Sequence, residues 1–325
     1  MTEQLRPDGS LRHLLTLETL SRAEIERLLE RAQTFVRPLG EKPPRSEVLA
    51  GLTVANLFTE PSTRTRVSFE LAAKRLGAEV VNLEVQLSSR VKGESMLDTV
   101  YTLQALHVDA LVIRDAEAGV PGLVARHVAP HVSVLSAGEA HVSHPTQGLL
   151  DALTIYQRKQ RFAGLAVAIV GDIRHSRVAR SAWHALRALG ATDLRIVGPA
   201  ALMPETDEFA GCTRYRKLAE GLKGVDVIMM LRIQKERFGD ADVPDGERYF
   251  STWGLTPERL ALARPDAIVM HPQPMNRGIE IASEVADGPQ SVIRDQVRNG
   301  VAVRMAVLAE VLGARGARMT SSTPP

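Results

Sequence analysis

The chain has 325 residues, which is enough for two domains of ordinary size. Its formal net charge of +2 and its aromatic content of 4% argue against nucleic-acid binding and against stacking platforms for single strands. One cysteine, Cys212, permits no internal disulfide, no apolar run approaches the roughly 18 residues of a membrane span, and the polar N-terminus lacks a secretion signal. These features favour a cytoplasmic protein.

The first predicted helix begins at Ser21, where Glu24 completes a capping box. Apolar residues then recur at helical spacing, as Ile25, Leu28, Leu29 and Ala32. Residues 37–45 contain three prolines and a glycine, and this composition predicts a loop.

Strand and helix patterns alternate after residue 50. Short apolar segments predict strands at residues 52–58, 79–84, 110–114, 132–136, 165–170, 193–197, 225–231 and 267–270. Amphipathic segments predict helices at residues 63–76, 94–107, 119–128, 145–159, 176–189, 214–221 and 289–313. Uniformly apolar strands between helices indicate parallel sheets that are covered on both faces.

The predicted fold is α/β, with two doubly wound parallel-sheet domains and the active site in the interdomain cleft. Residues 1–143 form the first predicted domain, which the C-terminal helix at about 289–313 completes. Residues 144–288 form the second, and the helix at 145–159 bridges the two. Residues 316–325 are rich in Ser, Thr and Pro, which predicts a disordered tail.

The segment 58–70 contains the clearest candidate chemistry. Pro61 ends the strand and Ser62 can cap the following helix, whose first turn holds Thr63, Arg64 and Thr65. A helix N-terminus presents backbone N–H groups and a positive dipole end, so this turn suits a phosphate. The pattern G-x-x-x-x-G-K-[ST] is absent, so this is no Walker loop. A capped helix with exposed arginines explains these residues equally well.

Further cations follow predicted strands. Arg114 ends one strand, Arg177 follows the loop after a second, and Arg232 with Gln234 follows a third. Ligands of open α/β sheets bind beyond the carboxyl ends of the strands, and two such arginines could each hold a carboxylate. Lys92 lies in a polar loop and could reach into a site, although a solvated lysine is the simpler interpretation.

Two histidine motifs complete the candidate residues. His144 in the run 144–147 could polarise a carbonyl group, although a lone histidine is more often structural. His141 and His144 form no complete ligand set, so no metal is assigned. The loop 271–274 contains two prolines, which would fix its backbone carbonyls towards a ligand. The glycine spacing of a dinucleotide loop is absent after Val170.

Taken together, these segments resemble the aspartate/ornithine carbamoyltransferase family. Residues 62–65 resemble its phosphate signature and residues 144–147 match a second motif. Three more segments look like the aspartate branch of the family, the aspartate carbamoyltransferase catalytic chains: residues 171–181, 231–237 and 271–281. The resemblance extends from about residue 14 to 312. The probability that five motifs occur in the family's order by chance is very small.

The resemblance implies that carbamoyl phosphate and L-aspartate give N-carbamoyl-L-aspartate and phosphate, for pyrimidine biosynthesis, without a cofactor. It implies a phosphate site formed by Ser62, Thr63, Arg64 and Thr65. It implies contacts to the carbamoyl group from Thr65, Arg114, His144, Gln147 and the backbone of Gln273 and Pro274, and a catalytic set of Arg64, Thr65, Arg114 and His144. Gln273 departs from the glycine or leucine expected there, which affects the shape of the pocket.

The L-aspartate site implied by the resemblance consists of Lys92, Arg177, Arg232 and Gln234. Ser88 and Lys92 would come from a neighbouring subunit, which makes a homotrimer the minimal active unit. Partner chains in the family are regulatory chains or dihydroorotase.

Two alternatives stay open. An ornithine carbamoyltransferase is expected to carry a cysteine in an H-C-L-P loop and an S-M-G segment, whereas this loop is His271-Pro272-Gln273-Pro274 and the segment is missing. A catalytically silent relative that binds anions or scaffolds an assembly would be expected to lack a charged motif residue.

Overall fold

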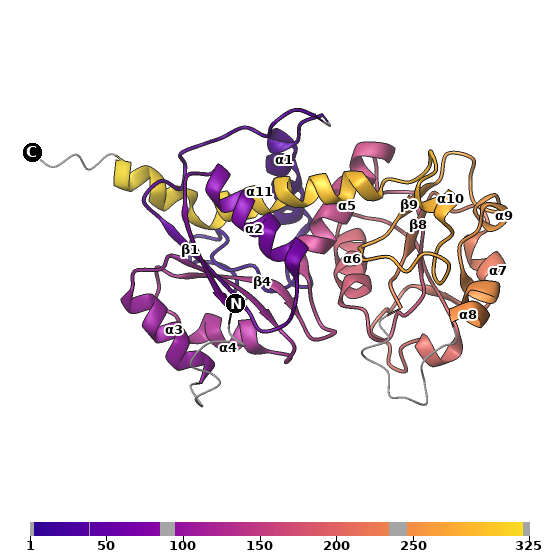
Figure 1. Cartoon of the computed structure of the whole chain (residues 1–325), viewed down its shortest axis with the longest axis horizontal. Helices are drawn as coiled ribbons and strands as arrows, with labels where there is room; N and C mark the ends of the chain where they lie inside the picture. Colours follow the sequence, from indigo (N-terminus) through magenta and orange to yellow (C-terminus); the bar gives the residue numbers. More distant parts are fainter. Residues whose placement is uncertain (1–2, 39, 85–94, 234–245, 321–325) are drawn as a thin grey trace, which may run out of the picture. The chain divides into compact units, whose positions relative to one another are not determined.

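Two parallel sheets, each with its own helices, organise the chain (Figure 1). The computed structural model describes residues 3–38, 40–84, 95–233 and 246–320, of which residues 84 and 314–320 are described by their backbone. The chain divides into unit 1, residues 1–149 and 298–325, and unit 2, residues 150–297. The predicted α/β class with two parallel sheets is confirmed. That the active site lies in a cleft between domains stays a prediction.

The sheet of unit 1 has the order β2-β1-β3-β4, and every neighbouring pair is parallel. Its strands are β1 (Thr53–Phe58), β2 (Glu79–Glu84), β3 (Ala110–Asp115) and β4 (Ser133–Glu139). All seven residues of β4 are buried, as expected for a strand covered on both faces. Because the strands are parallel, the segments that follow β1, β3 and β4 emerge at one edge of this sheet.

Helices cover both faces of that sheet. They are α1 (Arg22–Phe35), α2 (Thr63–Arg75), α3 (Met96–Ala105), α4 (Val120–His127), the start of α5 (Pro145–Lys159) and most of α11 (Ile293–Thr320). α3 and α4 lie together on one side of the sheet (Figure 1), where Val100 and Val124 pack with Ile113. The predicted capping box of α1 is confirmed.

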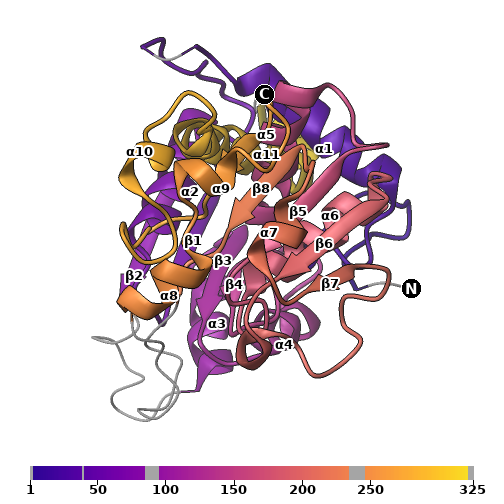
Figure 2. The ribbon, with the colours of Figure 1, turned by 90° about the vertical axis from the view of Figure 1, so that its right-hand side faces the viewer.

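Unit 2 contains a five-stranded sheet of order β7-β6-β5-β8-β9 (Figure 2). Its strands are β5 (Ala166–Val170), β6 (Asp193–Val197), β7 (Thr213–Tyr215), β8 (Val227–Met230) and β9 (Ile268–Met270). Its helices are the rest of α5, α6 (Arg177–Ala188), the 3₁₀ turn η3 (Ala200–Leu202), α7 (Leu218–Leu222), α8 (Gly246–Trp253), α9 (Pro257–Leu260) and α10 (Ser283–Ala286).

The structure corrects two predictions about local structure. The helix predicted at residues 214–221 is wrong at its start, because residues 213–215 form β7, which completes its backbone hydrogen bonds on β6. α11 continues to Thr320, so residues 316–320 are helical where a tail was predicted. The helix-favouring Ala, Arg and Met of this stretch outweigh its one glycine, Gly316. Residues 321–325 lie outside the described part of the chain.

Within the described ranges, no helix is long and apolar enough to cross a membrane.

Candidate active site

The turn between β1 and α2 places the predicted phosphate residues at the carboxyl edge of the first sheet. Ser62 occupies the N-cap position of α2, but its side chain makes no capping hydrogen bond. The expectation that Ser62 caps the helix is therefore wrong. Its φ of −159° and ψ of 74° direct the chain into the helix without that bond. Thr63 and Arg64 are exposed, whereas Thr65 is buried.

Arg114 is fixed beside this turn by groups on both sides. Its Nε lies 2.8 Å from a carboxylate oxygen of Glu60, and its Nη1 donates to the carbonyl of Ala137 at 3.1 Å. The backbone N–H of Thr59 donates to the carbonyl oxygen of Arg114 at 3.0 Å. The guanidinium side chain is 12% exposed. The structure thus holds a cation at the end of β3, next to the turn that leads into α2.

His144 and Gln147 lie at the start of α5, beyond the end of β4, and both are buried. The carbonyl of His144 accepts from the N–H groups of Gln147 at 2.9 Å and Gly148 at 3.2 Å. The hydroxyl of Ser143 donates to the carbonyl of Leu15 at 3.1 Å, which anchors the segment just before the histidine. The end of β3 and the segments after β1 and β4 therefore carry those predicted site residues of unit 1 that the structure describes.

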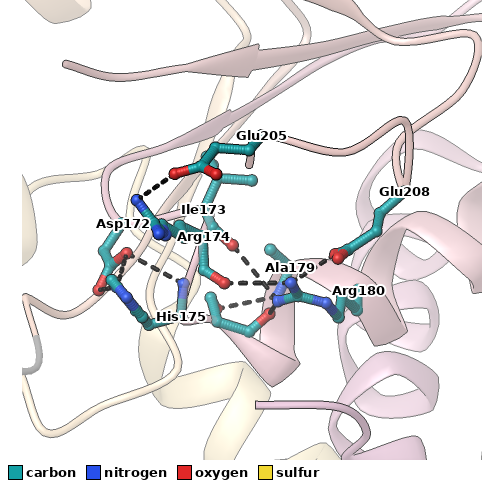
Figure 3. Close-up of polar contacts among 9 residues, drawn as sticks. Asp172, Ile173, Arg174, His175, Ala179, Arg180, Glu205 and Glu208 are labelled. Atoms are coloured by element: carbon teal, nitrogen blue, oxygen red, sulfur yellow. Dashed lines mark hydrogen bonds and ion pairs between the residues drawn. The ribbon is translucent and has the colours of Figure 1, made fainter. Parts of the chain in front are cut away.

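In unit 2, the turn from β5 to α6 is held by its own side chains (Figure 3). The hydroxyl of Ser176 accepts from the N–H of Ala179 at 3.1 Å and caps the helix. The buried carboxylate of Asp172 accepts from the backbone N–H of His175 at 3.1 Å and contacts its ring at 3.0 Å. Arg180 donates to the carbonyls of Ile173 and Arg174 and pairs with Glu208.

That turn determines the position of Arg177, the first residue of α6, which is 7% exposed. Arg232 follows β8, the neighbour of β5 in the sheet. The two strand ends approach closely, since a Cβ added at Gly171 would lie 3.3 Å from the Cβ of Leu231. The two arginines therefore follow neighbouring strands at one edge of the sheet. Ser88, Lys92 and Gln234 lie outside the described residues.

The loop 271–274 after β9 is fixed by a buried network that was not predicted. The Nδ1 of His271 accepts from the N–H of Gln273 at 2.8 Å, so Nε2 carries the proton and donates to Glu280 at 3.1 Å. The side-chain oxygen of Gln296 accepts from the N–H of His271 at 3.0 Å, and its amide donates to Asp151 at 2.8 Å.

This network supports an unusual backbone at the predicted carbamoyl contact. Gln273 has a φ of 57° and a cis peptide bond to Pro274. His271 contacts Glu280 from the segment before α10 and Gln296 from α11, and Gln296 in turn contacts Asp151 of α5. Only Glu280 lay inside a segment that the sequence singled out.

Two residues of unit 2 have perturbed acidity. Burial raises the pKa of the Tyr249 hydroxyl, and the charges of Glu280 and Asp172 raise it further. Burial also raises the pKa of the Cys212 thiol to about 11, so it stays protonated at neutral pH and is a poor nucleophile. In the ranges that the structure describes, no group of three or more His, Cys, Asp and Glu side chains could hold a metal ion.

Both halves of the sequence match family models. Residues 12–157 match "Aspartate/ornithine carbamoyltransferase, carbamoyl-P binding domain". Residues 163–311 match "Aspartate/ornithine carbamoyltransferase, Asp/Orn binding domain".

Solved structures of two kinds are similar to this chain. Aspartate transcarbamoylase from Trypanosoma cruzi in complex with N-(phosphonacetyl)-L-aspartic acid shares 33% identity with a TM-score of 0.82, covering 92% of this chain and 95% of that chain. Ornithine carbamoyltransferase from Pyrococcus furiosus shares 31% identity with a TM-score of 0.82, covering 93% and 97%. Ornithine carbamoyltransferase from Thermus thermophilus shares 27% identity with a TM-score of 0.80, covering 93% and 99%.

Proposed function

The chain belongs to the aspartate/ornithine carbamoyltransferase family, and we propose that it transfers the carbamoyl group of carbamoyl phosphate to the amine of L-aspartate. The products are N-carbamoyl-L-aspartate, which feeds pyrimidine biosynthesis, and phosphate. The observation that carries the choice of aspartate is the pair Arg177 and Arg232, which follow neighbouring strands of unit 2. Two guanidinium groups suit a substrate with two carboxylates.

In this proposal the first turn of α2 binds the phosphate, through backbone N–H groups, the hydroxyls of Ser62, Thr63 and Thr65, and the charge of Arg64. Its place at the sheet edge next to Arg114 supports that role. Arg114, Thr65 and His144 act on the carbamoyl oxygen, and Gln147 with the carbonyls of Gln273 and Pro274 holds the carbamoyl nitrogen.

The proposed reaction needs no enzyme nucleophile, because phosphate is already a good leaving group. The neutral amine of aspartate attacks the carbamoyl carbon, the C–O bond to phosphate breaks, and the departing phosphate accepts the amine proton. Negative charge develops on the carbamoyl oxygen, where Arg114, Thr65 and His144 stabilise it. The ion pair with Glu60 keeps Arg114 in one orientation before substrate arrives, so little reorganisation accompanies the reaction.

Ornithine is the second candidate, because ornithine carbamoyltransferases are among the similar structures. Against it, the loop 271–274 contains no cysteine and the charges after β5 and β8 are positive. The purified enzyme should be assayed with carbamoyl phosphate and either L-aspartate or L-ornithine. We expect carbamoyl-aspartate and phosphate in equal amounts. Citrulline as the sole product would refute the choice of aspartate, and no phosphate release with either amine would favour a silent relative.

We also propose a homotrimer in which Ser88 and Lys92 of one subunit complete the site of its neighbour. Lys92→Ala and Arg114→Ala chains should each be nearly inactive. Mixed trimers of the two should regain activity, because one site in such a trimer can receive intact residues from both chains. Mixtures without activity would contradict shared sites, and a monomer by mass measurement would contradict the trimer.

A further inference from the structure

Arg304 of α11 is a buried cation without a carboxylate partner. Its side chain is 4% exposed, and its Nη1 donates to the carbonyl of Gly300 at 2.9 Å. The Nε has no hydrogen-bond partner within the described ranges. Among the side chains that the structure describes, no carboxylate forms an ion pair with it. Burial lowers the pKa of Arg304 to about 10, so the guanidinium stays charged at neutral pH.

Other arginines that contact α11 have a carboxylate partner. Arg27 and Arg31 of α1 both pair with Glu310, at 2.9 and 2.7 Å, and both are more exposed than Arg304. A charge that is buried without a counter-charge costs folding free energy, whereas an apolar residue of similar volume would cost none. The arrangement around Arg304 is therefore unfavourable for stability and calls for a functional reason.

The position of Arg304 supplies that reason. The carbon at the centre of its guanidinium lies 5.0 Å from the centre of the Phe69 ring. Phe69 is on α2, one helical turn after Thr65, and both side chains lie on the buried face. Long side chains on a helix lean towards its N-terminus. The charge of Arg304 therefore contacts α2 one turn after Thr65, on the buried face of the helix that carries the proposed phosphate site.

We propose that Arg304 is a positioning residue of the phosphate site, and that the phosphoryl group bound at the first turn of α2 is its missing counter-charge. This inference rests on the proposed function. The cation–π contact between Arg304 and Phe69 holds α2 in place. The charge of Arg304 attracts the phosphoryl group through the protein interior, which screens charges poorly. At a separation of about 10 Å and an effective dielectric constant of about 20, the attraction corresponds to roughly tenfold in affinity for one negative charge.

The test uses Arg304→Met in the full-length protein, with titration calorimetry against inorganic phosphate. We expect phosphate to bind about tenfold more weakly, and the ligand-free variant to melt at the same or a higher temperature than the wild type. Arg31→Met is the matched control, because it removes the same charge from a compensated, half-exposed position. Its affinity for phosphate should equal that of the wild type.

Arg304→Lys decides the matter if the methionine variant does not fold. A buried lysine loses its proton more readily than arginine. The ratio of the variant's phosphate affinity to that of the wild type should therefore be close to one at pH 7 and fall as the pH rises to about 9, below the pKa of Arg304. A ratio that is the same at every pH would overturn the proposal, as would unchanged affinity in a folded Arg304→Met protein.

Arg64→Ala separates this inference from the function on which it rests. If Arg64→Ala weakens phosphate binding and Arg304→Met does not, the role of Arg304 alone is wrong. If neither variant weakens phosphate binding, phosphate binds elsewhere and the proposed site at α2 is wrong as well.

Discussion

Two strand–turn–helix segments, one in each unit, differ in whether the serine before the helix makes a capping hydrogen bond. In unit 1, β1 leads into α2 past Ser62, whose side chain makes no capping bond. In unit 2, β5 leads into α6 past Ser176, whose hydroxyl caps the helix at 3.1 Å, while Asp172 binds the backbone of His175 (Figure 3). The helix start in unit 1 is left without a side-chain cap, and that in unit 2 is closed by its own residues.

The difference suggests how each turn recognises its ligand. An uncapped helix start can offer its backbone N–H groups and its dipole to a phosphate. A capped start has one of its donors already satisfied, so we expect a side chain to take over recognition, here the buried guanidinium of Arg177. The proposed phosphate site therefore relies on the helix end itself, and the proposed carboxylate site relies on arginines that a stiff turn holds in place.

Removing the fixed cation beside the uncapped turn should have the largest effect. Arg114→Ala should lower turnover by about 10²–10³, because it deletes one donor to the developing charge on the carbamoyl oxygen. Steady-state kinetics measure the effect, and a melting curve checks the fold, since Glu60 loses its partner. Arg126→Ala, at an exposed arginine of α4 that pairs with Glu3, is the control. Turnover near wild type in Arg114→Ala would remove this residue from the catalytic set.

Removing the side chain that serves the capped turn should have a different signature. Arg177→Ala should raise the KM for aspartate by about 10- to 100-fold and leave the KM for carbamoyl phosphate unchanged, because it deletes a charged hydrogen bond to one substrate only. Arg174→Ala is the control three residues earlier, where an exposed arginine pairs with Glu205. Equal increases in both KM values would mean that Arg177 does not distinguish the substrates.

The third strand end of unit 2 extends the comparison, because side chains also stiffen the loop 271–274. Gln296→Leu should lower the free energy of unfolding by about 2 kcal/mol, since it removes the hydrogen bond to the N–H of His271 and the one to the carboxylate of Asp151, both buried. Denaturant titration measures the loss. Gln160→Leu, at an exposed glutamine, should change little. Equal stability of the two variants would show that the network does not hold the loop.

Substituting the serine before each of the two helices tests the capping bonds themselves, and the expected effect is small. Ser176→Ala should cost about 1 kcal/mol of stability, because it removes the capping bond to Ala179. Ser62→Ala should cost nothing measurable, because no such bond exists. The same denaturant titration compares them, and a larger loss for Ser62→Ala would reverse the distinction between the two turns.

The sequence predicted the parts of the fold that have local signals, and it supplied candidate site residues that stay predictions. Alternating apolar strands and amphipathic helices located the two parallel sheets, and the strand ends pointed to Arg114 and Arg177. It did not predict the network around His271, because Asp151 and Gln296 are 145 positions apart and only the tertiary fold brings them together. The lack of a carboxylate partner for Arg304 among the described side chains was not predicted for the same reason, since a sequence does not tell which arginines form ion pairs. The absent cap at Ser62 was missed because a serine before a helix normally makes that bond.

A crystal structure of this protein with N-(phosphonacetyl)-L-aspartic acid, the ligand of one of the similar structures, would test both proposed binding sites at once. We expect its phosphonate at the first turn of α2, on residues 62–65, and its carboxylates on Arg177 and Arg232. A phosphonate bound away from that turn, or carboxylates that leave both arginines untouched, would contradict the account.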